Sequence, residues 1–526
     1  MRTNKPVPIT TPATPFALRL ATLVWACVPA LALAAGCAAP VRFPDQPLAV
    51  TPASAGTVRT YDTDADGRAD YFTTADAADR TVRIGYDLNR DGEPDSLVDL
   101  DTIPAAGARH VVIILDGFGF DTVEAYQKEG RLGLFHPPAR VISTFPPMTD
   151  LALADIFRSV PPTALEVVHF DHQRNALVGG DGDYLSLLNE DWARRCDYRA
   201  GTLTDPLSYL FPGYIFGQEL GDLAQLFDRR DRPQIVAYLV STAGLGTRDG
   251  LDGQRRALAA IDRLAEEFVW KTRGLVKVTL LSDHGHTLIQ GERADFRGFL
   301  AGNGWRTQDR LDGPRDVVCI EYGLITYASF ATRDRPALAA ELVKHPASDL
   351  VIYDDGAAIV VQKPGGRAFI ERRGDRYRYR AVEGDPLELA PLLAKAKADP
   401  ATAALVDTDG YADDRAWLRL TLTHKYPDPA VRLWRAFHSQ TEHVPDVIVS
   451  LKDGYFAGST SRSGWLGRVA STHGDLAQRS STAFIMSTAG PAAQRWPYLR
   501  CADLPPVLEA LTGRPWPPVA QGGGRP

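Results

Sequence analysis

Five short runs of almost continuous apolar residues mark the chain, at 111–115, 234–240, 276–281, 446–451 and 482–487. Their content of valine, isoleucine and leucine is typical of central strands that are covered on both faces. Between the second and third runs, apolar residues recur at helical spacing and predict an amphipathic helix over 252–271. These residues are Leu258, Ile261, Leu264 and Phe268. Alternating strands and helices predict a doubly wound α/β sheet with helices on both faces.

The first 36 residues predict a lipoprotein signal peptide. Residues 1–19 are polar and basic, residues 20–36 (LATLVWACVPALALAAG) are uncharged and apolar, and Cys37 follows them. This order is typical of a secretory signal. The small residues before Cys37 resemble the bacterial lipobox, where the signal is cleaved and the cysteine is lipidated. An ordinary signal peptide or an uncleaved anchor is the alternative.

Lipidation of Cys37 predicts a protein that is tethered to the bacterial cell envelope. No second apolar stretch is long enough to cross a membrane. Residue 38 is alanine rather than aspartate, which by analogy with bacterial lipoproteins favours the outer membrane, facing the periplasm or the exterior. The lipid anchor would make the membrane a partner of the chain.

A linker and a small acidic repeat are predicted to follow. Residues 37–58 are rich in proline, alanine and threonine, which is typical of a linker. In the segment 59–103, DTDADGRAD at 62–70 and DLNRDGEPD at 87–95 follow the spacing of a calcium loop, without its final glutamate. The candidate calcium ligands are Asp62, Asp64, Asp66, Asp70, Asp87, Asn89, Asp91 and Asp95. The alternative is that Asp-Gly turns simply connect a short β-hairpin repeat without metal.

Composition and charge narrow the range of functions. The 526 residues contain 44% hydrophobic and 23% charged residues, which excludes a disordered chain and a collagen. The signal removes three of the 58 basic residues and none of the 65 acidic ones, so residues 37–526 carry a net charge of −10. We therefore expect no nonspecific binding of nucleic acid. An anionic substrate remains allowed, because a bound cation can reverse the local field.

Candidate metal ligands stand directly after two of the predicted strands. Asp116 follows the run at 111–115, and Asp283 with His284 follows the run at 276–281. Carboxylate and imidazole groups together suit zinc or manganese. Thr149 follows a proline-rich loop and begins a helical pattern, where backbone donors favour a phosphate group. The alternative for Thr149 is a plain helix cap.

The order of these motifs resembles the alkaline phosphatase superfamily, and within it the type I phosphodiesterases and nucleotide pyrophosphatases. The similar motifs are Asp-Gly at 116–117, FPPMT at 145–149, SDHG at 282–285 and THG at 472–474. The final strand and the closing helix, CADLPPVLEALTGRPWP, are also similar, so the resemblance covers roughly residues 108–515. It implies one alkaline phosphatase-like domain over 104–526, with a cap insertion at about 300–440.

The resemblance also implies a set of site residues. Asp116, Thr149, Asp283 and His284 would hold one divalent metal, with the Thr149 oxygen also the catalytic nucleophile. His473 would be a ligand of a second metal. The family's other two ligands of that metal form Asp-x-x-x-His, but here Ala243 and Thr247 stand at those places. Both ligands are missing, so we expect one ion rather than two.

Three interpretations stay open at this point. The chain is a one-metal hydrolase or transferase acting on phosphate esters, most of all phosphodiesters. Alternatively, replacement ligands rebuild the second metal site, with Asp249 and His286 the nearest candidates in sequence. In the third interpretation, the domain is a catalytically inactive phosphatase-like lipoprotein that binds a ligand or a protein partner.

Overall fold

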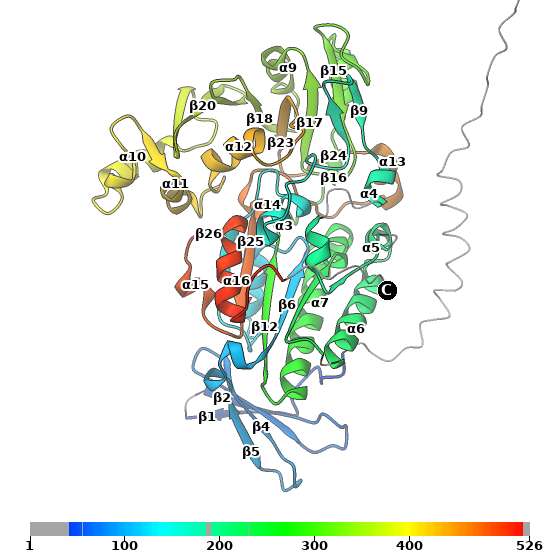
Figure 1. The fold of residues 1–526 in the computed structure, drawn as a ribbon, viewed down its shortest axis with the longest axis vertical. Coiled ribbons are helices and arrows are strands. Elements are labelled where there is room, and N and C mark those ends of the chain that lie inside the picture. Colours follow the sequence, from blue (N-terminus) through cyan, green and yellow to red (C-terminus); the bar gives the residue numbers. More distant parts are fainter. Residues whose placement is uncertain (1–40, 55, 186–190, 203, 230, 519–526) are drawn as a thin grey trace, which may run out of the picture.

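The computed structural model describes residues 41–54, 56–185, 191–202, 204–229 and 231–518, shown as the coloured ribbon in Figure 1. The predicted signal peptide and Cys37 lie outside the described residues. Within the described part, no helix is both long and apolar enough to span a membrane.

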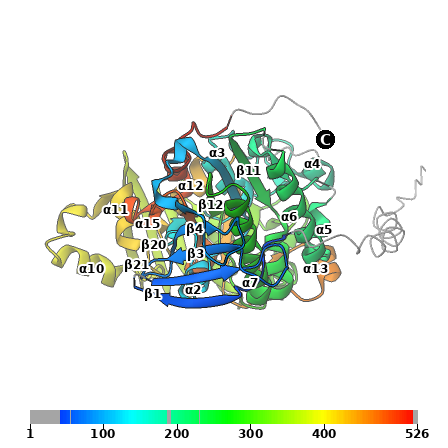
Figure 2. The ribbon, with the colours of Figure 1, turned by 90° about the horizontal axis from the view of Figure 1, so that it is seen from below.

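The N-terminal part forms a five-stranded antiparallel sheet with the strand order β1-β2-β3-β4-β5. Its strands are β1 (Ala49–Ala53), β2 (Gly56–Tyr61), β3 (Tyr71–Ala75), β4 (Thr81–Tyr86) and β5 (Ser96–Asp99). Figure 2 looks onto this sheet from below. Both acidic segments of the predicted repeat connect neighbouring strands, one between β2 and β3 and the other between β4 and β5.

The predicted linker at 37–58 needs correction, because parts of it pack against or pair with the rest of the chain. β1 and the start of β2 lie within it and pair with each other. Before them, Phe43 is only 2% exposed, and its ring centroid lies 5.0 Å from that of Tyr61. The Arg263 guanidinium also donates to the Phe43 carbonyl. The proline and alanine content of this stretch is typical of a linker, so the sequence did not show that Phe43 is buried and fixes the stretch to the rest of the chain.

A seven-stranded sheet forms the centre of the molecule, in the order β10-β11-β6-β12-β25-β7-β26. Its strands are β6 (Arg109–Leu115), β7 (Ala139–Ile142), β10 (Tyr198–Arg199), β11 (Gln234–Leu239), β12 (Val276–Ser282), β25 (Thr482–Ser487) and β26 (Leu499–Arg500). β10, β11, β6 and β12 are parallel, whereas β25 is antiparallel to both of its neighbours. Four of the five predicted strands therefore meet in one sheet.

Helices cover both faces of this sheet, which confirms the predicted α/β fold class. Alternate side chains of β6 enter two separate hydrophobic clusters. Val111, Ile113 and Leu115 pack with α2 (Phe120–Lys128), α6 (Pro212–Asp228) and α7 (Ser241–Lys271). Val112 and Ile114 pack with α3 (Thr149–Phe157) and α16 (Leu504–Thr512) on the other face.

The helix predicted over 252–271 is the second half of α7. The helix assignment begins at Ser241 and continues through a kink at Gly250, whose φ of +59° and ψ of −135° are not helical. The first half contains Gly244 and Gly246 and lacks the apolar stripe of the second half. Periodicity therefore detected only the part that packs on the sheet through a regular stripe.

A nine-stranded sheet lies at the opposite end of the molecule from the N-terminal sheet (Figure 1). Its order is β14-β15-β17-β23-β18-β19-β20-β21-β22. The strands are β14 (Arg306–Thr307), β15 (Asp316–Ile320), β17 (Tyr327–Thr332), β18 (Ser348–Asp354), β19 (Ile359–Lys363), β20 (Gly366–Arg373), β21 (Arg376–Glu383), β22 (Tyr411–Asp413) and β23 (Val447–Leu451). The helices of this region include α8 (Phe296–Gly302), α9 (Arg335–Leu342), α10 (Ala390–Ala398), α11 (Asp414–Thr421) and α12 (Pro429–His438).

The fifth predicted strand, at 446–451, belongs to this second sheet as β23. It is buried on both faces like the strands of the seven-stranded sheet, so the apolar run could not show to which sheet it belongs. The predicted boundaries of a cap insertion, about 300–440, stay a prediction.

The orientation of the seven-stranded sheet follows from its neighbours. The Lys277 side chain, near the start of β12, donates to the Leu100 carbonyl just beyond β5. The amino ends of the parallel strands therefore face the N-terminal sheet. Their carboxyl ends, where ligands gather in such sheets, face the nine-stranded sheet.

A histidine inside this core gives the fold a pH dependence. His110 in β6 is fully buried, and its Nε2 lies 2.8 Å from Thr279 Oγ1. Burial, with a smaller effect of the Arg514 and Lys277 charges, lowers its pKa from 6.5 to about 3. The folded state thus favours the neutral ring, so this stabilisation is complete above pH 6.5 and is lost as the pH falls towards 3.

We predict that His110→Phe flattens the pH dependence of stability. From pH 6.5 to 4.5, the wild type should lose a few kcal/mol more unfolding free energy than the variant, since only the wild type has a ring that the unfolded state protonates and the folded state keeps neutral. Urea unfolding at several pH values, with a chelator always present, measures this difference. Parallel curves for the two proteins would contradict the prediction.

Candidate metal centre

Two neighbouring strands bring the predicted metal ligands together. β6 and β12 are parallel and adjacent, and Leu115 lies opposite Ser282 at their carboxyl ends. Asp116 and Asp283 are the next residues along the two strands. The same register therefore places both carboxylates side by side, and His284 follows Asp283 directly.

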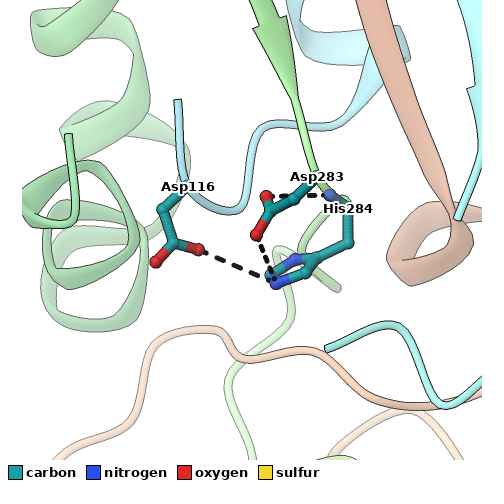
Figure 3. A group of neighbouring side chains, drawn as sticks. All are labelled: Asp116, Asp283 and His284. Atoms are coloured by element: carbon teal, nitrogen blue, oxygen red, sulfur yellow. Dashed lines mark hydrogen bonds and ion pairs between the residues drawn. The ribbon is translucent and has the colours of Figure 1, made fainter. Parts of the chain in front are cut away.

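Asp116, Asp283 and His284 form a buried cluster whose side chains point toward one another (Figure 3). Each offers a ligand atom within 4.8 Å of those of the other two. His284 Nε2 lies 3.3 Å from Asp283 Oδ2 and 3.7 Å from Asp116 Oδ1. The three residues are at most 2% exposed. Their donor atoms therefore converge on one point that solvent hardly reaches.

Two carboxylate oxygens of the cluster have no hydrogen-bond partner among the described residues. These are Asp116 Oδ1 and Asp283 Oδ2, and both are buried. Burial, and next the charge of Asp283, raises the pKa of Asp116 well above its usual range. Burial likewise raises the pKa of Asp283. A divalent cation would supply the missing positive charge, so the residues fit a metal.

His284 is held in the form that binds metal. Burial lowers the pKa of His284 to about 4, so the ring is neutral at pH 7. Its Nδ1 lies 3.0 Å from the Gly285 carbonyl oxygen, which can only accept a hydrogen bond. Nδ1 therefore carries the proton, and Nε2 directs its lone pair toward the two carboxylates.

Thr149 faces the cluster and does not cap its helix. It is the first residue of α3, whose N-cap is Met148 and has no side-chain cap bond. Thr149 Oγ1 instead lies 3.2 Å from His284 Nε2. Thr149 is partly exposed, unlike Asp116, Asp283 and His284. It therefore lies closer to solvent than the three buried residues of the cluster.

His473 lies at the edge of the cluster. Its ring stacks on that of His284, with centroids 3.9 Å apart. Nδ1 donates to the Pro147 carbonyl oxygen at 2.8 Å, two residues before Thr149. His473 is not among the residues whose ligand atoms lie within 4.8 Å of one another. The structure thus places it beside Thr149 and His284, and its role as a ligand stays a prediction.

The place of a second metal offers few donors. Ala243 and Thr247 are both buried in α7 and carry no carboxylate or imidazole. The ring of His286 fills the space next to them, because a Cβ atom on Gly117 would lie 2.6 Å from it and one on Gly246 only 3.0 Å. Among the described residues, no second trio of acidic or histidine side chains forms here.

The two proposed replacement ligands have different positions. His286 is buried, its Nδ1 lies 3.1 Å from Ser471 Oγ, and its Nε2 has no partner. Asp249 is exposed and forms an ion pair with Arg256. Asp249 therefore points away from the site, so its proposed role needs correction, because α7 turns this position toward solvent. His286 alone does not rebuild a second site.

The first acidic loop brings its carboxylates together at the surface. Asp62, Asp64 and Asp66 have ligand atoms within 4.8 Å of one another. The Arg90 guanidinium lies 3.0 Å from Asp64 and 3.3 Å from Asp66. Asp70 accepts hydrogen bonds from the backbone and hydroxyl of Thr63. An arginine thus balances part of the charge that calcium would neutralise.

The second acidic loop uses its side chains to close the turn. Asp87 accepts from the backbone amides of Arg90 and Gly92. Asn89 donates to Asp91 and Asp95. Bonds of this kind also form in turns without metal, so calcium binding by either loop stays a prediction.

The comparison with known proteins gives a weak likeness in structure. No protein-family model and no curated protein matches the chain. Among solved structures, the chain is similar to phosphonoacetate hydrolase from Sinorhizobium meliloti 1021 in complex with phosphonoformate, with 12% sequence identity and a TM-score of 0.42. The match covers 82% of this chain and 99% of that chain. The chemistry proposed below therefore rests on the side chains of this chain.

Sequence reasoning missed Tyr238, which orients one of the carboxylates. The Tyr238 hydroxyl donates to Asp116 Oδ2 at 2.6 Å and leaves Oδ1 free to face the cluster. Tyr238 lies in β11, opposite Ile114 of β6. Only the order of the strands reveals this contact, because the two residues are 122 positions apart in the chain.

We predict that Tyr238→Phe weakens binding of Mn²⁺ or Zn²⁺ by about 10- to 100-fold, since Asp116 loses the hydrogen bond that orients it. Isothermal titration of the chelator-treated protein measures the affinity. The matched control is Tyr198→Phe, because Tyr198 lies on the neighbouring strand β10 and its hydroxyl donates to Asp222 of α6 instead of to the cluster. Equal affinities for wild type and Tyr238→Phe would refute the orienting role.

Proposed function

We propose that the chain is a metal-dependent enzyme of the alkaline phosphatase superfamily that cleaves or transfers phosphate esters, phosphodiesters in particular. Thr149 is the nucleophile in this proposal, and Asp116, Asp283 and His284 hold the cation. The observation that carries it is the Thr149 hydroxyl, partly exposed and 3.2 Å from His284 Nε2, above two buried carboxylates with free oxygens. A hydroxyl in that position suits nucleophilic attack better than a structural role.

The cation, when bound, lowers the pKa of the Thr149 hydroxyl and neutralises charge on the phosphoryl group. Thr149 Oγ1 releases its proton to solvent and forms a bond to phosphorus as the bond to the leaving oxygen breaks, and the leaving oxygen takes a proton from solvent. Backbone amides at the start of α3 can donate to the phosphoryl oxygens. Water or an acceptor alcohol then attacks phosphorus and loses its proton, the phospho-threonine bond breaks, and Thr149 Oγ1 regains a proton.

In this proposal, His473 assists the second step. Because its Nδ1 donates to Pro147, its Nε2 carries the lone pair and can accept a proton from the attacking water or alcohol. Its backbone is fixed as well, since its carbonyl accepts from the Thr326 amide at 2.7 Å. The ring therefore has a defined position beside Thr149.

We also propose that a single cation, zinc or manganese, is sufficient. Ala243 and Thr247 supply no strong ligand, and the His286 ring fills the adjoining space. The expected place of action is the bacterial cell envelope, with a lipid on Cys37 and the outer membrane as the anchor. The alternative function is a noncatalytic lipoprotein that binds a ligand or partner through the same domain.

Exchange of the nucleophile separates these two functions. We predict that the mature protein hydrolyses bis(p-nitrophenyl) phosphate with Mn²⁺ or Zn²⁺, and that Thr149→Val lowers kcat by at least about a thousandfold. Valine keeps the shape of threonine but has no oxygen, whereas Thr149→Ser should keep part of the activity. Titration of the same variants with Mn²⁺ shows that the ion still binds.

Two results would count against the enzyme. Full activity of Thr149→Val would exclude Thr149 as nucleophile. Absence of turnover by the wild type with every common divalent ion, together with intact ion binding, would favour the noncatalytic alternative.

A further inference from the structure

Helix α12 lies in the part of the molecule that carries the nine-stranded sheet (Figure 1). Its residues Arg432 and Arg435 donate hydrogen bonds to segments that support the candidate site. Arg432 and Arg435 are three residues apart and therefore lie on the same side of the helix. Arg432 is only 3% exposed, which is rare for a charged side chain. Its guanidinium must therefore find all its partners within the protein.

One nitrogen of Arg432 joins two segments that are distant in sequence. Its Nη2 donates to the Thr144 carbonyl oxygen and to Ser481 Oγ, at 2.7 Å each. Nη1 donates to the Pro427 carbonyl oxygen, next to the start of α12. The guanidinium thus links its own helix to the loop after β7 and to α14 (Gln478–Ser481).

The first of these segments leads to the nucleophile. Residues 143–148 connect β7 to α3, so Thr144 lies five residues before Thr149. Arg435 supports the same unit farther along, because its Nη2 lies 2.8 and 3.0 Å from the two carboxylate oxygens of Asp155 in α3. α12 therefore holds both the approach to Thr149 and the helix that Thr149 begins.

The second segment leads to His473. Ser481 Oγ donates to the Leu476 carbonyl, and the Gly474 amide donates to Ser480 Oγ. The two segments also meet directly, because the Ser143 amide donates to the Ser481 carbonyl oxygen at 2.9 Å. Arg432 thus closes a network that holds the stretch just after His473 against the stretch just before Thr149.

The chemistry of arginine suits this position better than that of lysine. The planar guanidinium has donors in fixed directions, so it can bond to three acceptors on three segments at once. Asp428, the N-cap residue of α12, accepts two hydrogen bonds from Arg500. Among the described residues, no carboxylate forms an ion pair with Arg432, whose buried charge bonds to neutral acceptors instead, a costly arrangement for simple packing.

We propose that Arg432 is a positioning residue that fixes Thr149 relative to His473, while Arg435 secures α3. The effect of Arg432 on catalysis rests on the proposed function. Asp116, Asp283 and His284 follow β6 and β12 and lie on neither segment. Loss of Arg432 should therefore loosen the nucleophile side of the site while the cation ligands keep their places.

The test compares Arg432→Met, Arg432→Lys and Ser481→Ala with the control Arg380→Met. Arg380 pairs with Glu371 inside the β20–β21 hairpin and has no part in the site. The first measurement is amide hydrogen exchange of the metal-free full chain. We expect Arg432→Met to speed exchange in both 143–150 and 473–481 by about tenfold or more, because it removes bonds to both. Ser481→Ala should affect mainly 473–481.

The second measurement separates positioning from general damage. For Arg432→Met, we expect Mn²⁺ affinity within about twofold of wild type, and a kcat on the aryl phosphodiester that falls about tenfold or more at nearly constant KM. Arg432→Lys should recover part of the loss, since it keeps the charge and one donor to a carbonyl. Arg380→Met should match the wild type in each measurement.

The outcomes distinguish this proposal from the proposed function. Unchanged exchange in both segments, or a loss of protection throughout the chain together with loss of Mn²⁺ binding, overturns the positioning role. If Arg432→Met does not fold, the same criterion applies to Arg432→Lys and Ser481→Ala. Faster exchange confined to the two segments, in a chain that has no phosphodiesterase activity even as wild type, supports the positioning role and removes only the proposed chemistry.

Discussion

The candidate site depends on two carboxylates forced together at the ends of adjacent buried strands. Asp116 and Asp283 cannot separate, because the register of β6 and β12 fixes their backbones side by side. Two like charges in a dry environment are unfavourable unless a proton or a cation compensates them. The neutral His284 and the hydroxyl of Tyr238 orient the oxygens without removing that charge. The remaining unsatisfied oxygens therefore define where a cation would bind and why a hydroxyl beside it, that of Thr149, would be activated.

The same geometry supports our proposal of one ion rather than two. A second ion needs its own acidic or histidine ligands, and α7 has Ala243 and Thr247 at the two places where the resemblance puts them. The ring of His286 occupies the space beside Ala243 and Thr247. Gly117 and Gly246, which have no side chains, leave room for this ring. An uncharged imidazole next to the site does not add to the negative charge there. A single cation, balanced by two carboxylates, is then a self-consistent arrangement.

Much of the fold and the centre of the site could be predicted from local patterns. Apolar runs located β6, β11, β12 and β25, and the acids that directly follow β6 and β12 are those that meet in the buried cluster. Contacts that depend on strand order or on distant segments could not be predicted. Tyr238 reaches Asp116 only because β11 neighbours β6, and Arg432 reaches Thr144 across 288 residues. Composition gave a wrong prediction for part of the segment 37–58. Its proline and alanine content is typical of a linker, but Val41 and Phe43 are buried and β1 pairs with β2.

The location and number of the bound ions test the central claim most directly. Crystals of the mature protein soaked in Mn²⁺, with anomalous diffraction data, show each bound ion as a separate peak. The account predicts one strong peak among the side-chain oxygens of Asp116 and Asp283 and Nε2 of His284, with Thr149 Oγ1 beside it. No peak at that point, at Mn²⁺ concentrations that saturate binding in solution, would contradict it. So would a principal peak beside Ala243 and Thr247.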